Sequence, residues 1–334
     1  MFSKRHSLKL IIGLAIGAVF FYLTVRSVNF DQVLAALTQT NYGLVALSAG
    51  VMMTAHGLRA MRWRFLLAPV KLLHTRSLFS ALLIGYAANT FVPAHLGEFL
   101  RAFVIGKKHD ISATAAFATI VVERIVDVVS LIAVMALVVI VHPFPEWVAT
   151  SGYIMLAGAL LLCAVLVGCK RFEAQTVALI RTLARPLPER IGQRFESLTL
   201  NFLHGVVPLK SAAHYLATVV LSIAIWLCYA AVYYICLIAF DLVAAYHLAW
   251  YVGLVVLVFT TISVVIPSTP GYVGTFHYLC QVSLVMFGVS ASAALSFAVI
   301  AHIVGVVPVA VAGLICANYE GVAIYRTAAN VRES

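Results

Sequence analysis

The sequence predicts an all-α polytopic membrane protein with six full spans and two re-entrant, broken hairpins in an inverted repeat. Hydrophobic residues make up 63% of the chain and charged residues 10%, whereas soluble domains carry about 25% charged residues. A chain of 334 residues cannot bury that much apolar surface in one core, so lipid must be its solvent. An internal repeat and the placement of the basic residues are the other two observations behind this prediction.

The chain contains an internal repeat. Residues 111–129 recur as residues 289–307, with nine identical positions. Just upstream of each copy, the pattern P-x-x-x-G-x-F begins at Pro93 and again at Pro270, 177 residues apart against 178 for the longer match. Each copy therefore has a Pro/Gly break inside apolar sequence. In membrane proteins, paired broken helices in two repeats are typical of a transport site between the repeats.

Six apolar stretches approach or exceed the roughly 20 residues needed to cross a bilayer. They are residues 8–25, 42–58, 113–141, 153–169, 213–240 and 290–317. The first follows a basic start and has no small-residue cleavage site, so we expect it to be an uncleaved span. Two more apolar stretches, 78–106 and 248–287, are interrupted at 89–97 and 267–274. We predict hairpins there, because irregular backbone at membrane depth must be buried in protein or line a wet cavity.

The basic residues predict the orientation. With the N-terminus in the cytoplasm, every basic cluster falls on the cytoplasmic side: 59–76, 107–108, 170–210, Arg326 and Arg332. The opposite loops then contain one arginine, Arg26, and no lysine, which is the positive-inside pattern. This agreement requires the first hairpin to return to the cytoplasm and the second to the outer face. Three crossings separate the hairpins, so the halves are inverted and both termini are cytoplasmic.

We therefore expect a single membrane domain, 1–334, in which 1–141 and 153–317 are the repeats, each ordered span, span, hairpin, span. Within the second repeat, 170–211 forms a basic cytoplasmic loop. Apolar residues recur in it at helical spacing: Ile191, Phe195, Leu198 and Phe202. An amphipathic helix on the inner membrane surface and a connector packed on the bundle both fit. The net charge of +10 lies in short loops, so it indicates orientation and no nucleic-acid partner.

Six ionisable residues are expected inside the membrane, where charges are costly and face a cavity or a partner. They are Glu98, Arg101, Glu123, Arg124, Asp127 and His302. Arg124 and Asp127 are three residues apart on one helix, so a local ion pair is available. A purely structural pair is the alternative, but apolar packing would replace such a pair at little cost. His302 and Gly305 stand in the second repeat where Arg124 and Asp127 stand in the first, so the predicted site is asymmetric.

The two breaks supply the other candidate site residues. They are Asn89, Pro93 and Gly97 in the first break, and Pro267, Pro270, Gly271, Gly274 and His277 in or beside the second. A helix that restarts after a break presents unpaired N–H groups suited to an anion. Two such ends, with Arg101 and Arg124, would hold a phosphate. Kinks that only shape packing are the alternative, and breaks at equivalent places in both repeats favour binding.

Three motifs now stand in order: N-x-x-x-P-x-x-x-G-E-x-x-R from Asn89, E-R-x-x-D from Glu123, and P-x-x-P-G from Pro267. Nearly the whole chain resembles the flippase-like transmembrane domain family of lysylphosphatidylglycerol synthases, also called UPF0104. The resemblance implies passage of lipids between leaflets, in aminoacyl-phosphatidylglycerol, hopanoid or lipid-linked sugar pathways. It implies that the charged residues of the first two motifs and the segment 267–274 match the family's motif positions.

The chain departs from that family in two respects. The bifunctional members carry a soluble aminoacyl-transferase domain, and none precedes the last residue, Ser334, so we do not expect synthesis of lysyl-lipid. The family pattern often has Gly-Gly after the last proline and an acid after the final glycine. Here Tyr272 and His277 occupy that neighbourhood.

The expected function is that of a flippase or transporter moving a polar-headed, phosphate-bearing lipid between the leaflets of a bacterial-type inner membrane. Its expected partner is an anionic phospholipid, a polyprenyl-phosphate-linked lipid or a hopanoid-type lipid. No P-loop, nucleophile elbow or zinc motif is present, and the six cysteines lack metal-ligand spacing, so we expect neither an enzyme nor a cofactor. An intramembrane transferase on a lipid-linked substrate, and a non-catalytic partner of a lipid-biosynthesis enzyme, stay open as alternatives.

Overall fold

The computed structural model describes residues 4–91, 96–141, 146–184, 188–205, 211–265 and 270–322. Within these residues the chain is helical and contains no strand. Four helices there are long and apolar enough to cross a membrane: α3 (Tyr42–Leu67), most of α7 (Glu146–Arg171), α10 (Ala212–Ala239) and α14 (Ala291–Tyr319). The prediction of a helical membrane protein is confirmed at this level. The number of spans and the side on which the termini lie stay predictions.

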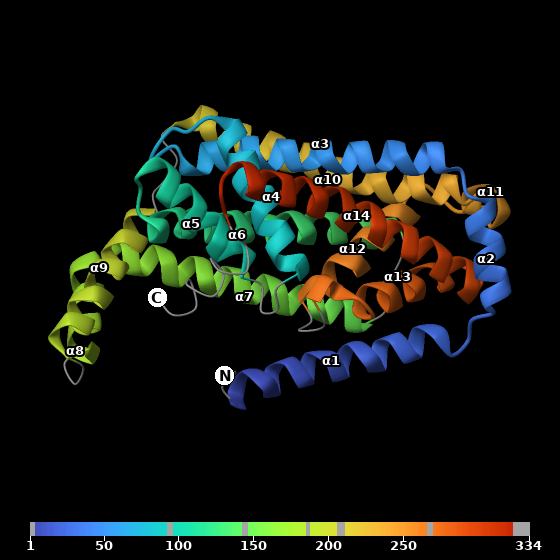
Figure 1. The fold of residues 1–334 in the computed structure, drawn as a ribbon, viewed down its shortest axis with the longest axis horizontal. Coiled ribbons are helices and arrows are strands. Elements are labelled where there is room, and N and C mark those ends of the chain that lie inside the picture. Colours follow the sequence, from blue (N-terminus) through green and yellow to red (C-terminus); the bar gives the residue numbers. More distant parts are fainter. Residues whose placement is uncertain are drawn as a thin grey trace.

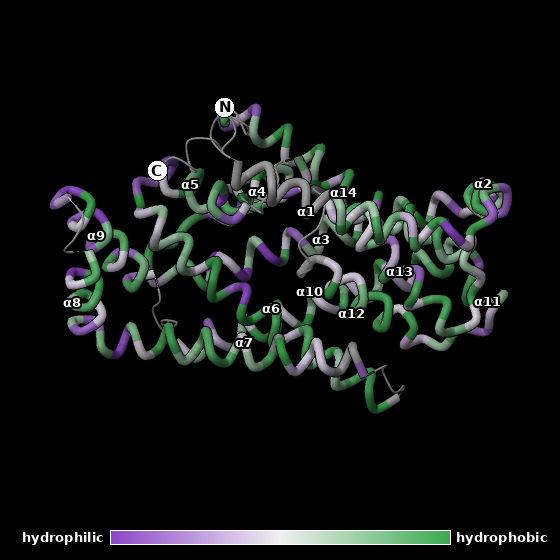
Figure 2. Tube along the Cα trace, turned by 90° about the horizontal axis from the view of Figure 1, so that it is seen from below, coloured by the Kyte–Doolittle hydropathy of each residue, from purple (hydrophilic) through white to green (hydrophobic). Residues whose placement is uncertain are grey.

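Two more helices correspond to the other predicted spans, α1 (Lys4–Val25) and α6 (Ala113–Val141). The remaining helices are α2 (Phe30–Gln39), α4 (Thr75–Phe91), α5 (Gly97–His109), α8 (Glu173–Ala184), α9 (Glu189–Gly205), α11 (Leu242–Ala245), α12 (Val252–Val265), the 3₁₀ turn η1 (Pro270–Tyr272) and α13 (Thr275–Val285). Three charged residues interrupt the otherwise apolar α6 at its middle. Figure 2 shows a hydrophilic stretch near α6 within mostly hydrophobic surroundings.

The first predicted hairpin consists of α4 and α5, which pack against each other. Its two ends lie together, because Lys71 Nζ donates a hydrogen bond to His109 O at 2.8 Å. The helices approach most closely at two glycines, where a Cβ on Gly85 would lie 2.8 Å from Gly97 O, and one on Gly97 would overlap Gly85 O. Only glycine fits at this crossing. Pro93 lies outside the described residues.

The second predicted hairpin consists of α12 and α13, with η1 between them. Its ends also lie together, since the Ser290 N–H donates to Tyr246 Oη at 3.4 Å. At the start of α13, Gly274 has a φ of +93°, and a Cβ there would lie 2.5 Å from Gly17 O of α1. This glycine therefore brings α13 against α1. Pro267 lies outside the described residues.

The two hairpins open toward opposite ends of the bundle. Helix α14 begins next to Tyr246, at the open end of the second hairpin, and ends where Glu320 pairs with Lys108 at 2.5 Å, at the open end of the first. Equivalent helix pairs are in contact in both halves: α3–α4 and α10–α12, α4–α5 and α12–α13, α5–α6 and α13–α14. An inverted repeat requires this geometry. The division into repeats 1–141 and 153–317 stays a prediction.

Helices α3 and α10 run side by side along the length of the molecule (Figure 1) and share its most extensive helix–helix contact. The predicted second span ended at residue 58, but α3 continues to Leu67. Arg59 and Arg62, which the sequence analysis placed in a cytoplasmic basic cluster, are instead buried, with 5% and 0% of their surface exposed. The predicted end of this span was wrong, because Arg59 and Arg62 find buried acidic partners on α6. The side of the membrane on which they lie stays a prediction.

The predicted basic loop 170–211 is largely helical, as α8 and α9, and protrudes at one end of the molecule (Figure 1). The end of α9 packs against α6, where a Cβ on Gly205 would overlap Ala115 O. Phe195 and Leu198 of α9 are exposed. The helical spacing is thus confirmed, and whether these apolar residues lie on a membrane surface stays a prediction.

Candidate functional site

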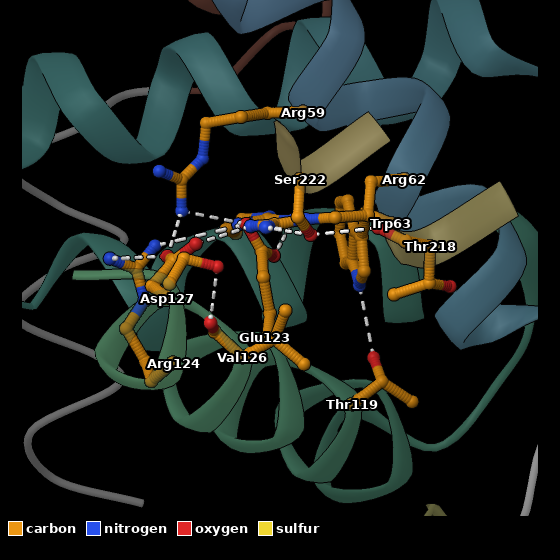
Figure 3. Close-up of polar contacts among 12 residues, drawn as sticks. Arg59, Arg62, Trp63, Thr119, Glu123, Arg124, Val126, Asp127, Thr218 and Ser222 are labelled. Carbon is orange, nitrogen blue, oxygen red and sulfur yellow. Dashed lines mark hydrogen bonds and ion pairs between the residues drawn. The ribbon is translucent and has the colours of Figure 1, made fainter. Parts of the chain in front are cut away.

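Four arginines and two carboxylates form a compact group inside the bundle, which we call the arginine cluster (Figure 3). Its members are Arg59 and Arg62 of α3, Arg101 of α5, and Glu123, Arg124 and Asp127 of α6. Apart from Arg124, whose side chain is 41% exposed, these side chains are at most 14% exposed. Arginine keeps its charge in proteins, so these helices meet through buried ions.

Glu123 lies within 3.5 Å of three arginines, and Arg124 Nη2 lies 4.0 Å from its Oε1. Its Oε1 accepts a hydrogen bond from Arg59 Nη2 at 2.8 Å, and its Oε2 accepts one from Arg101 Nη2 at 2.7 Å. Arg62 Nη2 lies 3.5 Å from Oε1. The Glu123 side chain has no exposed surface, so it is the buried counterion that joins α3, α5 and α6.

Asp127 binds the two arginines of α3. Its Oδ1 accepts from Arg62 Nη2 and its Oδ2 from Arg59 Nη2, both at 2.5 Å. Arg124 Nη1 lies farther away, 3.6 Å from Oδ2. The predicted local pair between Arg124 and Asp127 is therefore present but loose, and the short bonds of this carboxylate come from another helix.

Sequence reasoning missed Arg59 and Arg62 as site residues. A signal was present, since they lie three residues apart on α3 and so share one face, matching Glu123 and Asp127 four residues apart on α6. The positive-inside pattern outweighed it, because basic residues at the end of an apolar stretch ordinarily mark the cytoplasmic boundary.

Neighbouring side chains position the arginines of the cluster. Arg59 Nη1 donates to Tyr229 Oη at 3.2 Å, and Arg62 Nη1 donates to Ser222 Oγ at 3.0 Å. Both acceptors belong to α10. The guanidinium of Arg101 lies 3.6 Å from the ring centroid of Trp63, a distance at which the face of the indole attracts a cation. Arg124 has no comparable support in the described part of the chain.

The cluster carries more positive than negative charge. Four arginines against two carboxylates leave a formal charge of +2 (4 − 2). Glu98 is a further carboxylate beside it, but within the described residues it forms no ion pair and accepts only from Asn89 Nδ2, at 3.3 Å. Buried charge without a partner is costly, so the arrangement favours an anionic ligand.

At the first break, a side chain of α4 caps the start of α5. The N–H of Gly97, the first residue of α5, donates to Asn89 Oδ1 at 2.7 Å. The Asn89 side chain therefore occupies one of the N–H groups predicted to bind an anion, and anion binding by the rest of this helix start stays a prediction. Glu98, in the first turn of α5, adds a negative charge there. The arginine side chains carry the positive charge on this side.

The second break carries histidines in place of charges. His302 Nε2 donates to the carbonyl of Gly271 at 2.7 Å, and the rings of His302 and His277 have centroids 4.8 Å apart. Gly271, between Pro270 and Tyr272 in η1, has a φ of +70°, a conformation that glycine adopts without strain. The arrangement holds η1 against α14 through a neutral contact.

The two breaks meet over the cluster. A Cβ on Gly271 would lie 3.9 Å from Thr90 O at the end of α4, and α4 contacts η1. Tyr272 lies within electrostatic reach of Glu98 and Arg124. A void of about 10 Å³ between Asn89, Glu98 and Arg101 has room for roughly one water molecule. The hairpins therefore close this side of the site.

The family described as the lysylphosphatidylglycerol synthase TM region matches residues 10–313. The chain belongs to this family. The match includes both hairpins and every residue of the arginine cluster. The resemblance seen in the motifs is thus confirmed over nearly the whole chain.

Similar proteins include a UPF0104 membrane protein of Methanothermobacter thermautotrophicus, 23% identical over 93% of this chain and 95% of the relative. A UPF0104 membrane protein of Methanocaldococcus jannaschii is 28% identical over 35% of each chain. Glycosyltransferase AglD of Haloferax volcanii is 24% identical over 39% of this chain and 21% of its own length. The chain thus spans only about a third and a fifth of the last two. No solved structure matches.

Proposed function

We propose that this protein moves a lipid with an anionic, phosphate-bearing head between the leaflets of a bacterial-type inner membrane. The observation that carries this proposal is the arginine cluster, which places two more positive than negative charges between the two broken hairpins. Guanidinium groups match phosphate oxygens in pairs. In lipid, ionisable residues of this kind mark the path of a charged substrate.

The arginines of the cluster differ in how tightly the protein holds them, and we propose different roles for them. Arg59 and Arg62 are held by short bonds to carboxylates and to α10, so they fix the geometry of the cluster. Arg124 lies 3.6 and 4.0 Å from its nearest carboxylate oxygens and keeps 41% of its side chain exposed. It is thus the arginine most available to a phosphate, with Arg101 beside it. Glu123 and Asp127 position the guanidinium groups.

The hairpins supply the route. Because they open toward opposite ends of the bundle and meet over Arg124, each is suited to close the cluster from one leaflet, as broken helices do in transporters of inverted repeats. The void beside Arg101 is about one water in size, so a head group bound at the partly exposed Arg124 reaches Arg101 only when a hairpin moves. Alternating movement of the hairpins would pass the head across while the tails stay in lipid.

An intramembrane transferase is supported less well. General base catalysis needs a carboxylate free to accept a proton, and arginines hold Glu123 and Asp127. Of the carboxylates at the site, this leaves Glu98 as the candidate general base. The similarity to glycosyltransferase AglD covers 21% of that protein. A transport role uses the whole cluster, so we favour it.

Replacing Arg124 tests the proposal. In liposomes with fluorescent phosphatidylglycerol or a fluorescent polyprenyl phosphate, a membrane-impermeant quencher reports lipid that has moved between leaflets. We expect Arg124→Gln to abolish movement while its thermal unfolding in detergent stays near wild type, because no short bond is lost. Arg194→Gln, on the exposed face of α9, is the matched control. Movement by Arg124→Gln at the wild-type rate, or none by wild type above protein-free vesicles, would overturn the proposal.

A further inference from the structure

A large apolar groove lies on another side of α6, away from the hairpin breaks. Its volume is about 1280 Å³, more than the roughly 300–1,000 Å³ of pockets that hold small ligands. It runs between α6, α7 and α10, and its walls are mostly aliphatic and aromatic. Val126, Val129, Val167, Val219, Trp226 and Leu227 are among the lining residues.

The groove exists because α7 leans away from the bundle. Early in α7, Gly152 packs against α6 so closely that a Cβ there would lie 2.6 Å from Met135 Cε. The α7 residues that line the groove, from Cys163 to Arg171, all come from its second half. Among the spanning stretches, α7 has 18% of its residues buried, against 33% in α10. The helices therefore diverge toward the end at which α8 and α9 protrude (Figure 2).

In a bilayer this space takes hydrocarbon. Apolar cavities do not hold water, because a water molecule needs two or more polar partners. Exposed apolar side chains on both walls, such as Val219 of α10 and Val167 of α7, leave the groove open toward lipid. Lipid tails are thus the occupant that the chemistry of the walls selects.

The wide end of the groove carries basic groups. Lys170 and Arg171, in the last turn of α7, line it there. Lys170 Nζ pairs with Glu173 at 2.8 Å, while Arg171 forms no ion pair within the described residues. Long basic side chains near a helix end reach the membrane interface, where they attract anionic lipid. A phospholipid whose tails occupy the groove would therefore have its phosphate beside Lys170 and Arg171.

A polar contact marks the deep part of the groove. Ser222 and Thr218 line the α10 wall, and Ser222 Oγ accepts from Arg62 of the arginine cluster. Tyr215, near the wide end, lies seven positions before Ser222 on α10, which is about 10 Å of helix. An occupant of the groove therefore lies against the residue that holds Arg62 in place.

We infer that this groove is a lipid-binding site separate from the arginine cluster. It holds the hydrocarbon tails of one anionic phospholipid, and the phosphate of that lipid lies at Lys170 and Arg171. The site belongs to the leaflet at the end of the molecule where α8 and α9 protrude. It does not depend on which lipid the protein moves.

The test uses purified full-length protein in lipid nanodiscs with phosphatidylglycerol or phosphatidylcholine carrying a photoreactive group in one tail, followed by mapping of labelled peptides. We expect phosphatidylglycerol to label the groove faces of α7 and α10 in wild type. Val219→Trp fills the groove, so it should lose this labelling. Val220→Trp is the control, since Val220 is equally exposed, 54% against 56% for Val219, but does not line the groove. Ile223→Trp, one turn along the same wall, repeats the test if Val219→Trp fails to fold.

A second pair of variants tests the head group. Replacing Lys170 and Arg171 together by glutamine should remove the preference for phosphatidylglycerol over phosphatidylcholine and leave labelling of the groove by the tails. Arg190→Gln with Arg194→Gln, on α9 and outside the groove, should keep the preference. The labelling experiment does not require the protein to move lipid. If the liposome assay shows no lipid movement, labelling of the groove can still succeed, so the two proposals can fail independently.

Three outcomes would overturn the inference. In the first, label is spread evenly over both faces of α10, as expected for the lipid that surrounds any membrane protein. In the second, Val219→Trp and Val220→Trp lose label equally. In the third, Cys163, on the α7 wall, cross-links two copies of the chain, so that another protomer fills the groove.

Discussion

The two halves of this protein place different chemistry at equivalent positions. In α6 of the first half, Glu123, Arg124 and Asp127 belong to a buried ionic cluster. In α14 of the second half, the same spacing holds Ala301, His302 and Gly305. There the polar contacts are a neutral hydrogen bond from His302 to Gly271 O and the contact between two histidine rings.

The two halves share the same arrangement of helices but differ in the polar groups that they carry. Both halves have a hairpin whose second limb begins at a glycine in close contact with another helix, Gly97 with α4 and Gly274 with α1. Only the first half adds ions, and these join α3, α5 and α6. Under the proposed function, the first half would bind the charged head and the second half would close over it. Three variants would break or sharpen this comparison.

The largest effect is expected from Glu123→Gln. The change leaves Arg101 without its carboxylate partner and leaves Arg59 with Asp127 alone. Breaking a buried ion pair in this way costs about 3–5 kcal/mol. We expect most of the folded protein to be lost, or a large drop in the temperature of unfolding, followed by intrinsic fluorescence in detergent.

The control for this variant is Glu320→Gln. Glu320 pairs with Lys108 at the end of α14, where both side chains are partly exposed, and such pairs contribute about 0–1 kcal/mol. If Glu123→Gln unfolded no more readily than Glu320→Gln, the cluster would not hold the first half together.

A smaller effect is expected from Gly97→Ala. The added methyl group would overlap Gly85 O and the Asn89 side chain, so α4 and α5 must separate. Overpacking of this kind costs about 1–3 kcal/mol, and the shift of α5 would move Arg101 away from Glu123. Thermal unfolding and the lipid-movement assay measure the two consequences.

Gly158→Ala is the matched control, because a Cβ at Gly158 of α7 meets nothing within 4 Å. The second half offers a parallel in Gly274→Ala, which should loosen α1 and spare the ionic cluster. Equal behaviour of Gly97→Ala and Gly158→Ala would show that the close crossing of α4 and α5 is not needed.

The smallest effect is expected from Asn89→Ala. This variant removes the acceptor for the Gly97 N–H, and loss of a helix cap costs roughly 0.5–2 kcal/mol. Chemical denaturation in detergent measures the cost. A stability equal to wild type would mean that water caps α5 as well as Asn89 does.

The helices and breaks were predictable because they follow from local patterns. A run of apolar residues long enough for a bilayer marks a span whatever its neighbours are, and proline and glycine mark a break within it. Glu123, Arg124 and Asp127 stood out for the same reason, as charges in an apolar run. The bonding of Asn89 to Gly97 was not predicted, because it depends on how α4 and α5 cross.

The sequence by itself determined that the chain lives in lipid, where its helices break, and that α6 carries charge at mid-length. Only the tertiary structure decided which groups neutralise that charge. Arg59 and Arg62 lie 61–68 residues from their carboxylate partners, and from sequence alone they resemble residues that mark the cytoplasmic end of a span. They turn inward because α3 packs against both α6 and α10, where ion pairs and the hydroxyl groups of Tyr229 and Ser222 replace the water they would have had at the surface.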